Sequence, residues 1–508
     1  MRGTTTPAPV RQVRHRAERP AQRRARGLPG TVGVTLLGAV LPGAGYLWTR
    51  RVNLGLAVLM PSVSVAVTLG YLLGRDPRAV LDVAFSPTRL QVAAALLAGG
   101  LALWVLVVVT TYLLARPAQR GRAESWLGGG FVFVLCLAVA LPVLLGARYA
   151  MVQADLVHTV FQDNESATVP QDVTEEDPWA GRDRVNLLLL GGDGNVHRDG
   201  VRTDSIILAS MDTRTGRTVM FSLPRNMELA QFPEGSPLHD LYPEGFTGST
   251  DESNWLLNAV YGQVPVLHPR VLGKSDNEGA DALKQAVSGS LGVTVDYYVL
   301  VNLLGFRQLV DAMGGVTVNI NVPIPIGGNT DLGIAPDDYL QPGPAQRLDG
   351  FEALWYSRGR YGSDDYQRME RQRCMIDAII DEAQPWTLLR RYQDLAATGK
   401  EIVRTDIPSE LMPAFVDLAL EVKDAPVRSV VFRSSDRFWP ADPDFAWMRS
   451  VVRRALGPPS PRDRSLPGDA GSAGTPSAAP SVSPGVVPTP DPGDALDAGD
   501  ACAYRPVS

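Results

Sequence analysis

Hydrophobic positions divide the chain into two regions with different patterns. The N-terminal region holds four long apolar segments, at residues 31–48, 52–73, 90–114 and 127–145. Each is close to the roughly 20 residues that a helix needs to cross a bilayer, and the last three carry no charge. Because so many segments are inconsistent with a cleaved signal peptide or with buried core helices, the pattern predicts an integral membrane protein.

Positive charges suggest how this region is oriented. Arginines are concentrated before the first segment, which is typical of a cytoplasmic N-terminus. If all four segments cross, the large domain that follows is cytoplasmic as well. However, Pro and Gly interrupt the first segment at 41–45, as in re-entrant segments. If that segment does not cross, the basic clusters at 50–51 and 116–122 stay inside. The positive-inside rule therefore favours three full spans, one re-entrant segment and an extracellular domain in the cell membrane.

From Arg184 onwards, short apolar runs alternate with stretches of helical periodicity. A short apolar run bounded by glycines is typical of a strand buried on both faces. We expect strands at 187–190, 206–209, 218–222, 296–301, 316–322 and 429–432, and helices at 254–261, 279–291, 303–313 and 409–423. This order predicts an α/β fold, with a layered mixed sheet flanked by helices.

Two further helices are expected after an irregular loop at 323–347. Asp349 and Glu352 resemble a capping box, which predicts a short helix towards Ser357. A second helix should begin near residue 364, with Arg368 and Gln372 on one face. Glu370 and Arg371 are expected on a solvated face of the same helix.

The chain therefore has five expected parts. They are a basic cytoplasmic tail (1–29), a membrane region (30–148), a polar stalk (149–183), an α/β domain (184–456) and a tail (457–508). The last part is rich in Pro, Ser, Gly and Ala. It has too few large apolar residues to offset the entropy of ordering, so we expect disorder there.

Composition and cysteine positions narrow the function classes. The formal charge is −6 and no folded region is strongly basic, which argues against nucleic acid as a partner. The cysteines and histidines lack zinc spacing. Cys136 lies in the last apolar segment, whereas Cys374 and Cys502 are both extracellular in the favoured topology. Disulfides persist there, so a Cys374–Cys502 bond is a hypothesis, although sequence alone does not give connectivity.

Charged residues gather at the expected ends of the first three strands. Asp193, Arg202 and Asp204 lie in or beside the loop after the first strand, and Arg225 follows the third. Asp and Gly are also ordinary turn formers, and most surface Arg–Asp pairs are merely solvated. The glycines match neither the dinucleotide fingerprint nor the phosphate loop, so a nucleotide fold is not supported.

More guanidinium groups follow the two later helices. Arg358 and Arg360 lie just past the first of them, and Arg368 and Gln372 lie in the second. Guanidinium groups bind phosphate oxygens in bidentate fashion. Carboxylates suit Mg²⁺, which uses only one or two of them beside substrate phosphates. Together the two sets of residues predict a metal-assisted pyrophosphate site.

The residues between Asn186 and Arg373 resemble the LytR-CpsA-Psr family of bacterial cell-wall assembly proteins. The motifs that carry this resemblance are LLLLGGD at 187–193, VRTDSIIL at 201–208, SLPRN at 222–226, DAMGGVTV at 311–318, LDGFEALWYSRGR at 348–360 and QRMERQR at 367–373. The resemblance implies a phosphotransferase that moves a glycopolymer (teichoic acid, capsule or arabinogalactan) from a polyprenyl pyrophosphate carrier to peptidoglycan, forming a phosphodiester.

The resemblance also implies roles for individual residues. Asp193 and Asp204 would hold Mg²⁺ or Mn²⁺ and, with Arg202 and Arg225, form the catalytic group. The residues that would bind the pyrophosphate of the substrate are Arg358, Arg360, Arg368 and Gln372. The prenyl chain would lie in an apolar tunnel between sheet and helices. One departure is Leu256, where many members of the family have a lysine.

Two other functions are compatible with the same site. A polyprenyl-pyrophosphate pyrophosphatase would transfer to water instead of to a glycan. A non-catalytic regulatory protein would hold the lipid carrier without turnover, although it would have little need for both Asp193 and Asp204. A transporter is disfavoured because the apolar segments lack the buried charges that mark a pathway.

Overall fold

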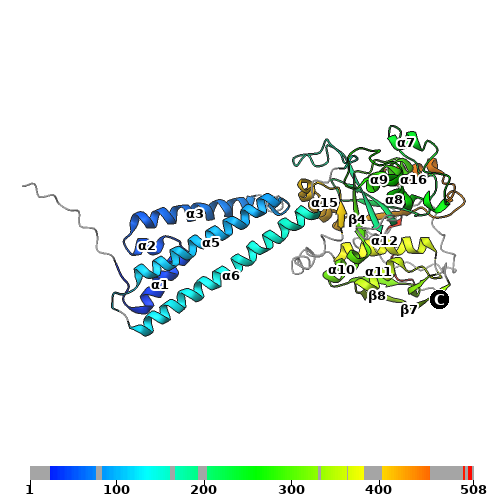
Figure 1. Ribbon diagram of the computed structural model, residues 1–508. Helices are drawn as coiled ribbons and strands as arrows, with labels where there is room; N and C mark the ends of the chain where they lie inside the picture. Colours follow the sequence, from blue (N-terminus) through cyan, green and yellow to red (C-terminus); the bar gives the residue numbers. More distant parts are fainter. Residues whose placement is uncertain are drawn as a thin grey trace, which may run out of the picture. The chain divides into compact units, whose positions relative to one another are not determined.

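The computed structural model describes residues 23–75, 83–119, 121–160, 166–192, 203–329, 333–362, 364–382, 403–457, 496–497 and 502–505. The chain divides into two compact units. The first comprises Met1–Leu81 and Thr88–Met151, and the second comprises Asp82–Pro87 and Val152–Ser508. Figure 1 shows that the first unit is built from helices, whereas the second combines helices with sheets. Expected site residues Asp193 and Arg202 lie outside the described ranges.

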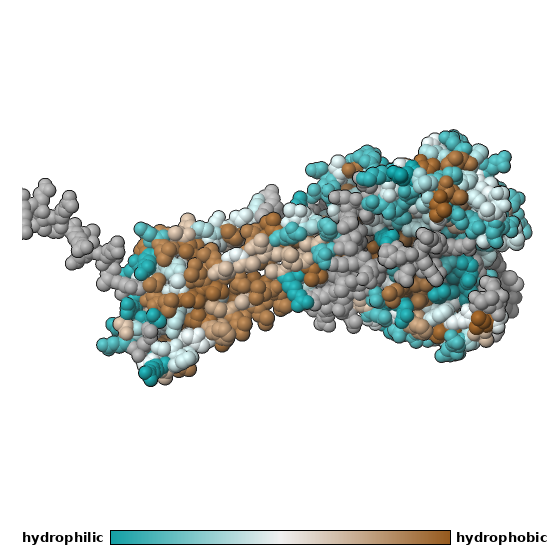
Figure 2. All heavy atoms as spheres, in the orientation of Figure 1, coloured by the Kyte–Doolittle hydropathy of each residue, from teal (hydrophilic) through white to brown (hydrophobic). Residues whose placement is uncertain are grey.

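The first unit is built from apolar helices. They are α1 (Gly27–Val40), α2 (Ala44–Trp48), α3 (Val52–Arg75), α5 (Pro87–Ala115) and α6 (Arg122–Val160). Within the described ranges, two helical stretches, Pro87–Ala115 and Arg122–His158, are long and apolar enough to cross a membrane. Apolar residues cover much of the visible face of this unit (Figure 2). The three full spans that we expected are therefore not all supported, because the apolar stretch within α3, Val52–Thr68, is shorter than these two.

The interruption expected in the first apolar segment is present. Helix α1 ends at Val40, and α2 begins only at Ala44. Between them Gly43 has φ = +100°, and a Cβ there would lie 2.5 Å from the carbonyl oxygen of Gly55. Only glycine tolerates both the positive φ and this close approach. The segment is thus folded as two short helices packed against neighbouring helices.

The second unit contains the mixed sheet predicted from the sequence. Its strands, in spatial order, are β11 (Leu496–Asp497), β10 (Val427–Val431), β3 (Thr218–Leu223), β2 (Thr203–Asp212), β1 (Arg184–Gly192), β4 (Tyr297–Asn302) and β9 (Val403–Thr405). The pairs β1–β4 and β3–β10 are parallel, and the other pairs are antiparallel.

Helices cover both faces of this sheet (Figure 1). On one face, Leu208 and Phe221 belong to the core that is shared with α8 (Val260–Leu267), α9 (Glu278–Leu291) and α16 (Phe445–Leu456). On the other face, Ile207 and its neighbours contact Ile376 of α12 (Asp365–Glu382). Adjacent residues of β2 face opposite layers, as the period of a strand requires. The apolar run is therefore continuous because the strand is buried on both faces.

A smaller core lies on the far side of α12 from the large sheet. It is formed by α10 (Leu303–Met313), β5 (Val316–Ile320), β6 (Ile324–Asn329), β7 (Ile334–Leu340), β8 (Gly343–Leu348), α11 (Gly350–Arg358) and part of α12. Strands β6, β7 and most of β8 occupy the stretch that we expected to be a loop. Pro325, Gly327 and Pro336 obscure the strand pattern there, and two-stranded sheets tolerate them because they consist only of edge strands.

One other expectation needs correction. The helix expected at 254–261 consists of two short 3₁₀ turns, η1 (Glu252–Asn254) and η2 (Leu257–Ala259), before α8 begins. The helix expected at 409–423 is present, as η3 (Ser409–Leu411) followed by α15 (Met412–Asp424). The short helix α7 (Pro237–Leu241) and helix α16 had no expected counterpart.

The expected stalk is not a free linker where the structure describes it. Residues 149–160 continue α6, and the chain from Ser166 packs on the α/β unit. Trp179 contacts Phe415 edge to face, with ring centroids 5.1 Å apart. Ser166 and Thr168 donate hydrogen bonds to Asp281 of α9. We did not expect this apolar contact or these hydrogen bonds, because the segment is rich in acidic residues.

A fully buried ion pair joins α9 to the chain after β9. The Lys284 ammonium lies 2.6 Å from a carboxylate oxygen of Asp406, and neither side chain is accessible to solvent beyond 1%. Lys284 also donates to the carbonyl oxygen of Asp296, and Asp406 accepts from the Tyr298 N–H. Burial raises the pKa of Asp406, and the Lys284 charge opposes this rise. The pair thus satisfies polar groups that no water reaches.

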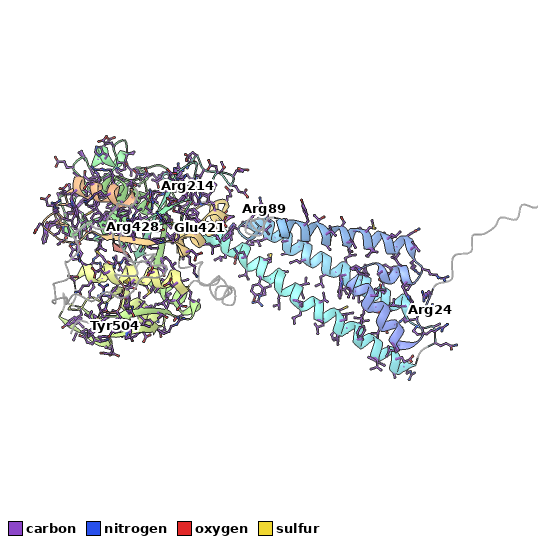
Figure 3. The ribbon with its side chains drawn as sticks, turned by 180° about the vertical axis from the view of Figure 1, so that it is seen from behind. Arg24, Arg89, Arg214, Glu421, Arg428 and Tyr504 are labelled. Carbon is purple, nitrogen blue, oxygen red and sulfur yellow. A yellow bond between two sulfur atoms is a disulfide. The ribbon has the colours of Figure 1, made fainter. Side chains whose placement is uncertain are left out.

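The end of the described chain returns to the α/β unit. Strand β11 pairs with β10, and Cys502 forms a disulfide with Cys374 of α12, which confirms that hypothesis. Asn319 and Asn321 donate to the carbonyl oxygens of Cys502 and Ala503. Figure 3 shows Tyr504 beside the small sheets. The expected disorder of 457–508 is therefore wrong for residues 496–497 and 502–505. Strand pairing and the disulfide stabilise these residues.

Replacing Lys284 alone should strongly destabilise the protein. The substitution Lys284→Met leaves Asp406 buried without a counter-charge, which costs about 3–5 kcal/mol. Thermal unfolding of the full chain in detergent measures this loss. The double variant Lys284→Met/Asp406→Leu should recover most of it, because an apolar pair carries no buried charge. Equal stability of the two variants would contradict this account.

Thiol titration should separate the three cysteines. In the denatured but unreduced protein we expect one reactive thiol, that of Cys136, and three after reduction, because Cys374 and Cys502 are bonded. The variant Cys502→Ser should show two thiols without reductant. Three thiols in the unreduced wild type would exclude the bond.

Candidate active site

Strand direction brings several strand ends to one edge of the large sheet. The parallel pairing of Gly192 with Asn302, and of Ser222 with Val431, places the carboxyl ends of β1, β3, β4 and β10 there. The amino end of β2 lies at the same edge, because Thr203 pairs with Gly192. Ligands of open α/β sheets bind outside the carboxyl ends of strands. This edge is the candidate site.

Asp204 and Arg225 meet directly at this edge. An Arg225 guanidinium nitrogen lies 2.5 Å from a carboxylate oxygen of Asp204. Ile206 pairs with Leu223 in the antiparallel register of β2 and β3. Continuing this register by two residues beyond that pair places residue 204 opposite residue 225. The Asp204 side chain is 40% exposed and that of Arg225 is 24% exposed. The pair is thus held by the sheet and remains open to a ligand.

The backbone after β3 is anchored by the 3₁₀ turn η2. The N–H of Asn258 donates to the carbonyl oxygen of Arg225, and the N–H of Leu257 donates to that of Met227. Leu256 is the residue just before this turn and is half-buried. Leu256, where the resemblance leads us to expect a lysine, therefore lies beside the segment that carries Arg225.

The first turns of helix α12, which carry Arg368, lie towards the same edge, and Gln372 follows one turn later. Arg373 of this helix donates to the Ser429 hydroxyl within β10, whereas the Tyr366 hydroxyl lies 2.6 Å from that of Ser434, beyond the end of β10. The helix therefore runs antiparallel to β10, with its first turns towards the edge where Arg225 lies. Arg368 is buried and Gln372 is half-buried, and Gln372 donates to the carbonyl oxygen of Ser357.

Arg358 is the last residue of α11, and Arg360 follows two residues later. The capping box of Asp349 and Glu352 is present and begins this helix as expected. Arg358 is exposed and its guanidinium lies over the ring of Trp355, 5.1 Å from the ring centroid, while Arg360 is half-buried. The structure thus joins Asp204 to Arg225 by direct contact, whereas Arg358 contacts Trp355.

Arg371 was wrongly expected on a solvated face. Its side chain is buried, and its guanidinium donates to the carbonyl oxygens of Tyr356 and Gly359 at the end of α11. Burial lowers the pKa of Arg371. The last carbonyls of a helix lack partners within it, and a cation there satisfies them. Helical spacing alone did not reveal this role, because the acceptors come from a different helix.

Asp204 has the donor chemistry expected of one magnesium ligand. Its carboxylate is a hard oxygen ligand and stands half-exposed at the strand edge. Within the described ranges, no group of three or more His, Cys, Asp or Glu side chains gathers in a way that could hold a metal ion.

A cavity of about 560 Å³ lies at the opposite edge of the sheet, near the beginning of β1. Its lining includes Arg182 and Arg184, but Arg182 pairs with Asp172 and Arg184 donates to Ser210. These guanidinium groups are engaged within the protein. The cavity therefore does not compete with the carboxyl edge as an anion site.

Removing the Arg371 guanidinium should loosen the end of α11. In Arg371→Met two buried carbonyl oxygens lose their donors, at a cost of about 2–4 kcal/mol in unfolding free energy. Thermal unfolding measures this cost. Arg433→Met is the matched control, because Arg433 makes only a partly exposed contact with Glu370, 3.7 Å away, and should cost less than about 1 kcal/mol. Equal losses would refute the capping role.

Several proteins are similar in sequence to part of this chain. The polyisoprenyl-teichoic acid–peptidoglycan teichoic acid transferase TagU of Oceanobacillus iheyensis is 27% identical over 295 residues, covering 57% of this chain and 78% of TagU. The TagU of Enterococcus faecalis is 27% identical over 303 residues, covering 58% of this chain and 82% of its own length. Biofilm regulatory protein A of Streptococcus mutans is also 27% identical, over 295 residues, covering 56% of this chain and 63% of that protein.

A solved structure and a family comparison complete these findings. The crystal structure of Bacillus subtilis TagV aligns with 54% of this chain and 97% of TagV, at 22% identity and a TM-score of 0.38. The sequence model of the LytR_cpsA_psr family matches residues 151–439. Since this match covers more than half of the chain and includes the strands and helices that form the candidate site, the protein belongs to the LytR_cpsA_psr family.

Proposed function

We propose that this protein transfers a glycopolymer from a polyprenyl pyrophosphate carrier to peptidoglycan and forms a phosphodiester bond. The Asp204–Arg225 pair carries the proposal, because it presents a carboxylate and a guanidinium together at the ligand-binding edge of the sheet. Arg368 and Gln372 on α12 supply further donors there. The activity for which the two TagU relatives are named supports this class of reaction.

In the proposed reaction, a sugar hydroxyl of peptidoglycan attacks the phosphorus nearer the glycopolymer. The new P–O bond joins polymer to acceptor, and the P–O bond between this phosphorus and the oxygen bridging to the second phosphate breaks. Polyprenyl phosphate leaves with the electron pair, and the hydroxyl proton passes to water. Arg225 and the arginines after α11 and within α12 neutralise the charge that develops on the phosphoryl oxygens. Asp204 holds the Arg225 guanidinium in place for this role.

Mg²⁺ or Mn²⁺ is proposed as the cofactor, with Asp204 as one ligand and Asp193 as the other. When bound, the ion supplies additional positive charge beside the phosphates. Arg202 is proposed to join the catalytic group. A carboxylate that holds an arginine and a metal is a poor base, so neither aspartate is assigned as the acceptor of the hydroxyl proton.

The α/β unit is proposed to lie outside the cell, anchored by several membrane-spanning helices. The Cys374–Cys502 disulfide supports this side, because such bonds persist in oxidising compartments and are rare in the cytoplasm. The long apolar helices α5 and α6 support the anchor. Helices α1 and α2, which are separated at Gly43, are proposed to form the re-entrant segment.

Substituting either residue of the pair should abolish most of the transfer. The assay uses the full chain in detergent, a polyprenyl pyrophosphate-linked oligosaccharide, Mg²⁺ and peptidoglycan fragments. Asp204→Asn and Arg225→Ala should each lower kcat by about 10²–10³-fold. Arg225→Ala removes a positive charge beside the transition state, and Asp204→Asn removes the carboxylate that holds this guanidinium and the proposed metal ion. Arg214→Ala is the control, because Arg214 pairs with Asp183 in an exposed position at the opposite edge and should retain full activity.

The same assay separates the rival functions. Sugar transferred to the acceptor, with release of polyprenyl phosphate that a chelator prevents, supports the proposal. Release that is independent of the acceptor would favour a pyrophosphatase. Binding of the lipid without release from any substrate would favour a carrier-binding regulatory protein.

A further inference from the structure

An exposed tryptophan stands in a rigid loop that borders the candidate site. After β10 the chain makes two tight turns, in which Ser435 pairs with Phe438 and Trp439 pairs with Asp442. We call residues 435–442 the paired-turn loop. Trp439 is 60% exposed, whereas the adjacent Phe438 is buried in the main core. An indole left in solvent beside a site needs a reason, because this side chain normally buries most of its surface.

The paired-turn loop is fixed in place from the core side. Phe438 packs against Phe432 and Trp447, with ring centroids 5.9 Å and 6.2 Å away. The backbone of the loop is closed by hydrogen bonds within each turn, such as the N–H of Asp442 donating to the carbonyl oxygen of Trp439. A ring held on such a loop loses little conformational freedom when a ligand contacts it.

The same loop is joined to the segment that carries Arg225. The N–H of Glu228 donates to the carbonyl oxygen of Pro440, with 2.8 Å between the atoms. Arg225 and Glu228 are three residues apart, so their Cα atoms are separated by at most about 11 Å. Trp439 is next to Pro440, and the loop follows the carboxyl end of β10, so it lies at the edge of the sheet where Arg225 follows β3.

The loop that carries the exposed indole also carries charged residues. Asp436, Arg437 and Asp442 lie in the same loop and are all exposed. Carboxylates accept hydrogen bonds from hydroxyl groups, and guanidinium groups donate to them. An aromatic face with such neighbours matches a pyranose ring, which has apolar C–H faces and a hydroxyl rim.

We propose that Trp439 is a stacking platform for a saccharide unit next to the reacting phosphate, and so determines glycan specificity. This inference rests on the proposed function for its substrate class. The saccharide belongs either to the carrier-linked polymer or to the peptidoglycan acceptor, and both offer the same pyranose chemistry. The platform positions the sugar and takes no part in the bond changes.

Steady-state kinetics of the full chain tests the platform. Trp439→Ala should raise KM for one of the two saccharide substrates by about three- to tenfold and leave kcat nearly unchanged, since an aromatic contact of this kind is worth about 0.5–1.5 kcal/mol. Trp439→Phe should restore part of the loss. Leu420→Ala is the matched control, because Leu420 is 52% exposed on α15, which packs at the opposite edge of the sheet. The substrate whose KM rises identifies the source of the sugar.

A binding experiment keeps the inference separate from the proposed reaction. Calorimetric titration with a peptidoglycan disaccharide fragment, and with the free oligosaccharide of the carrier, requires no turnover. Binding of one of them that weakens in Trp439→Ala but persists in Asp204→Asn supports the platform even if no transfer is found. Unchanged binding and KM for both sugars would overturn it. So would a loss of activity that occurs only in lipid nanodiscs and not in detergent, because it would assign the indole to the membrane surface.

Discussion

The register between β2 and β3 is the constraint on which the site depends. It sets Asp204 opposite Arg225, and both side chains are partly exposed at the carboxyl edge of the sheet. A slip of one residue would turn every side chain of β2 to the other face. The core prevents this slip, because Ile207 and Leu208 contact different layers. Packing of apolar residues therefore fixes the geometry of the charged ones.

Sequence patterns predicted those parts of the fold whose signals are local. The central strands, the helices α9 and α10, the capping box at Asp349 and the position of Asp204 and Arg225 near strand ends all follow from short-range periodicity and turn chemistry. Their direct contact was not predicted, because it depends on the register between β2 and β3. The layered mixed sheet was predicted as well. What the patterns lacked was the order of strands, because that order depends on contacts between residues more than a hundred positions apart, such as Leu187 and Tyr297.

The errors share a physical origin. Arg371, the stalk and the stretch 323–347 are all polar or rich in Pro and Gly, so composition alone assigned them to solvent. In the fold each finds a specific partner: carbonyl oxygens for Arg371, Phe415 for Trp179, and neighbouring strands for β6 and β7. Burial of a polar group is favourable only when its partner is in place, and a single stretch of sequence does not show that partner. Asp193 and Arg202 stay predictions.

The disulfide also sets an order of assembly. Cys374 precedes Cys502 by 128 residues, and the bond closes the whole intervening chain into one loop. Helix α12, which lies between the two cores and carries Arg368, cannot acquire this bond until the chain as far as Cys502 has been synthesised and, in the proposed topology, exported. Until then only packing and hydrogen bonds hold α12 and the arginine that it carries. In the proposed topology, locking of this helix therefore depends on the oxidising capacity of the cell envelope.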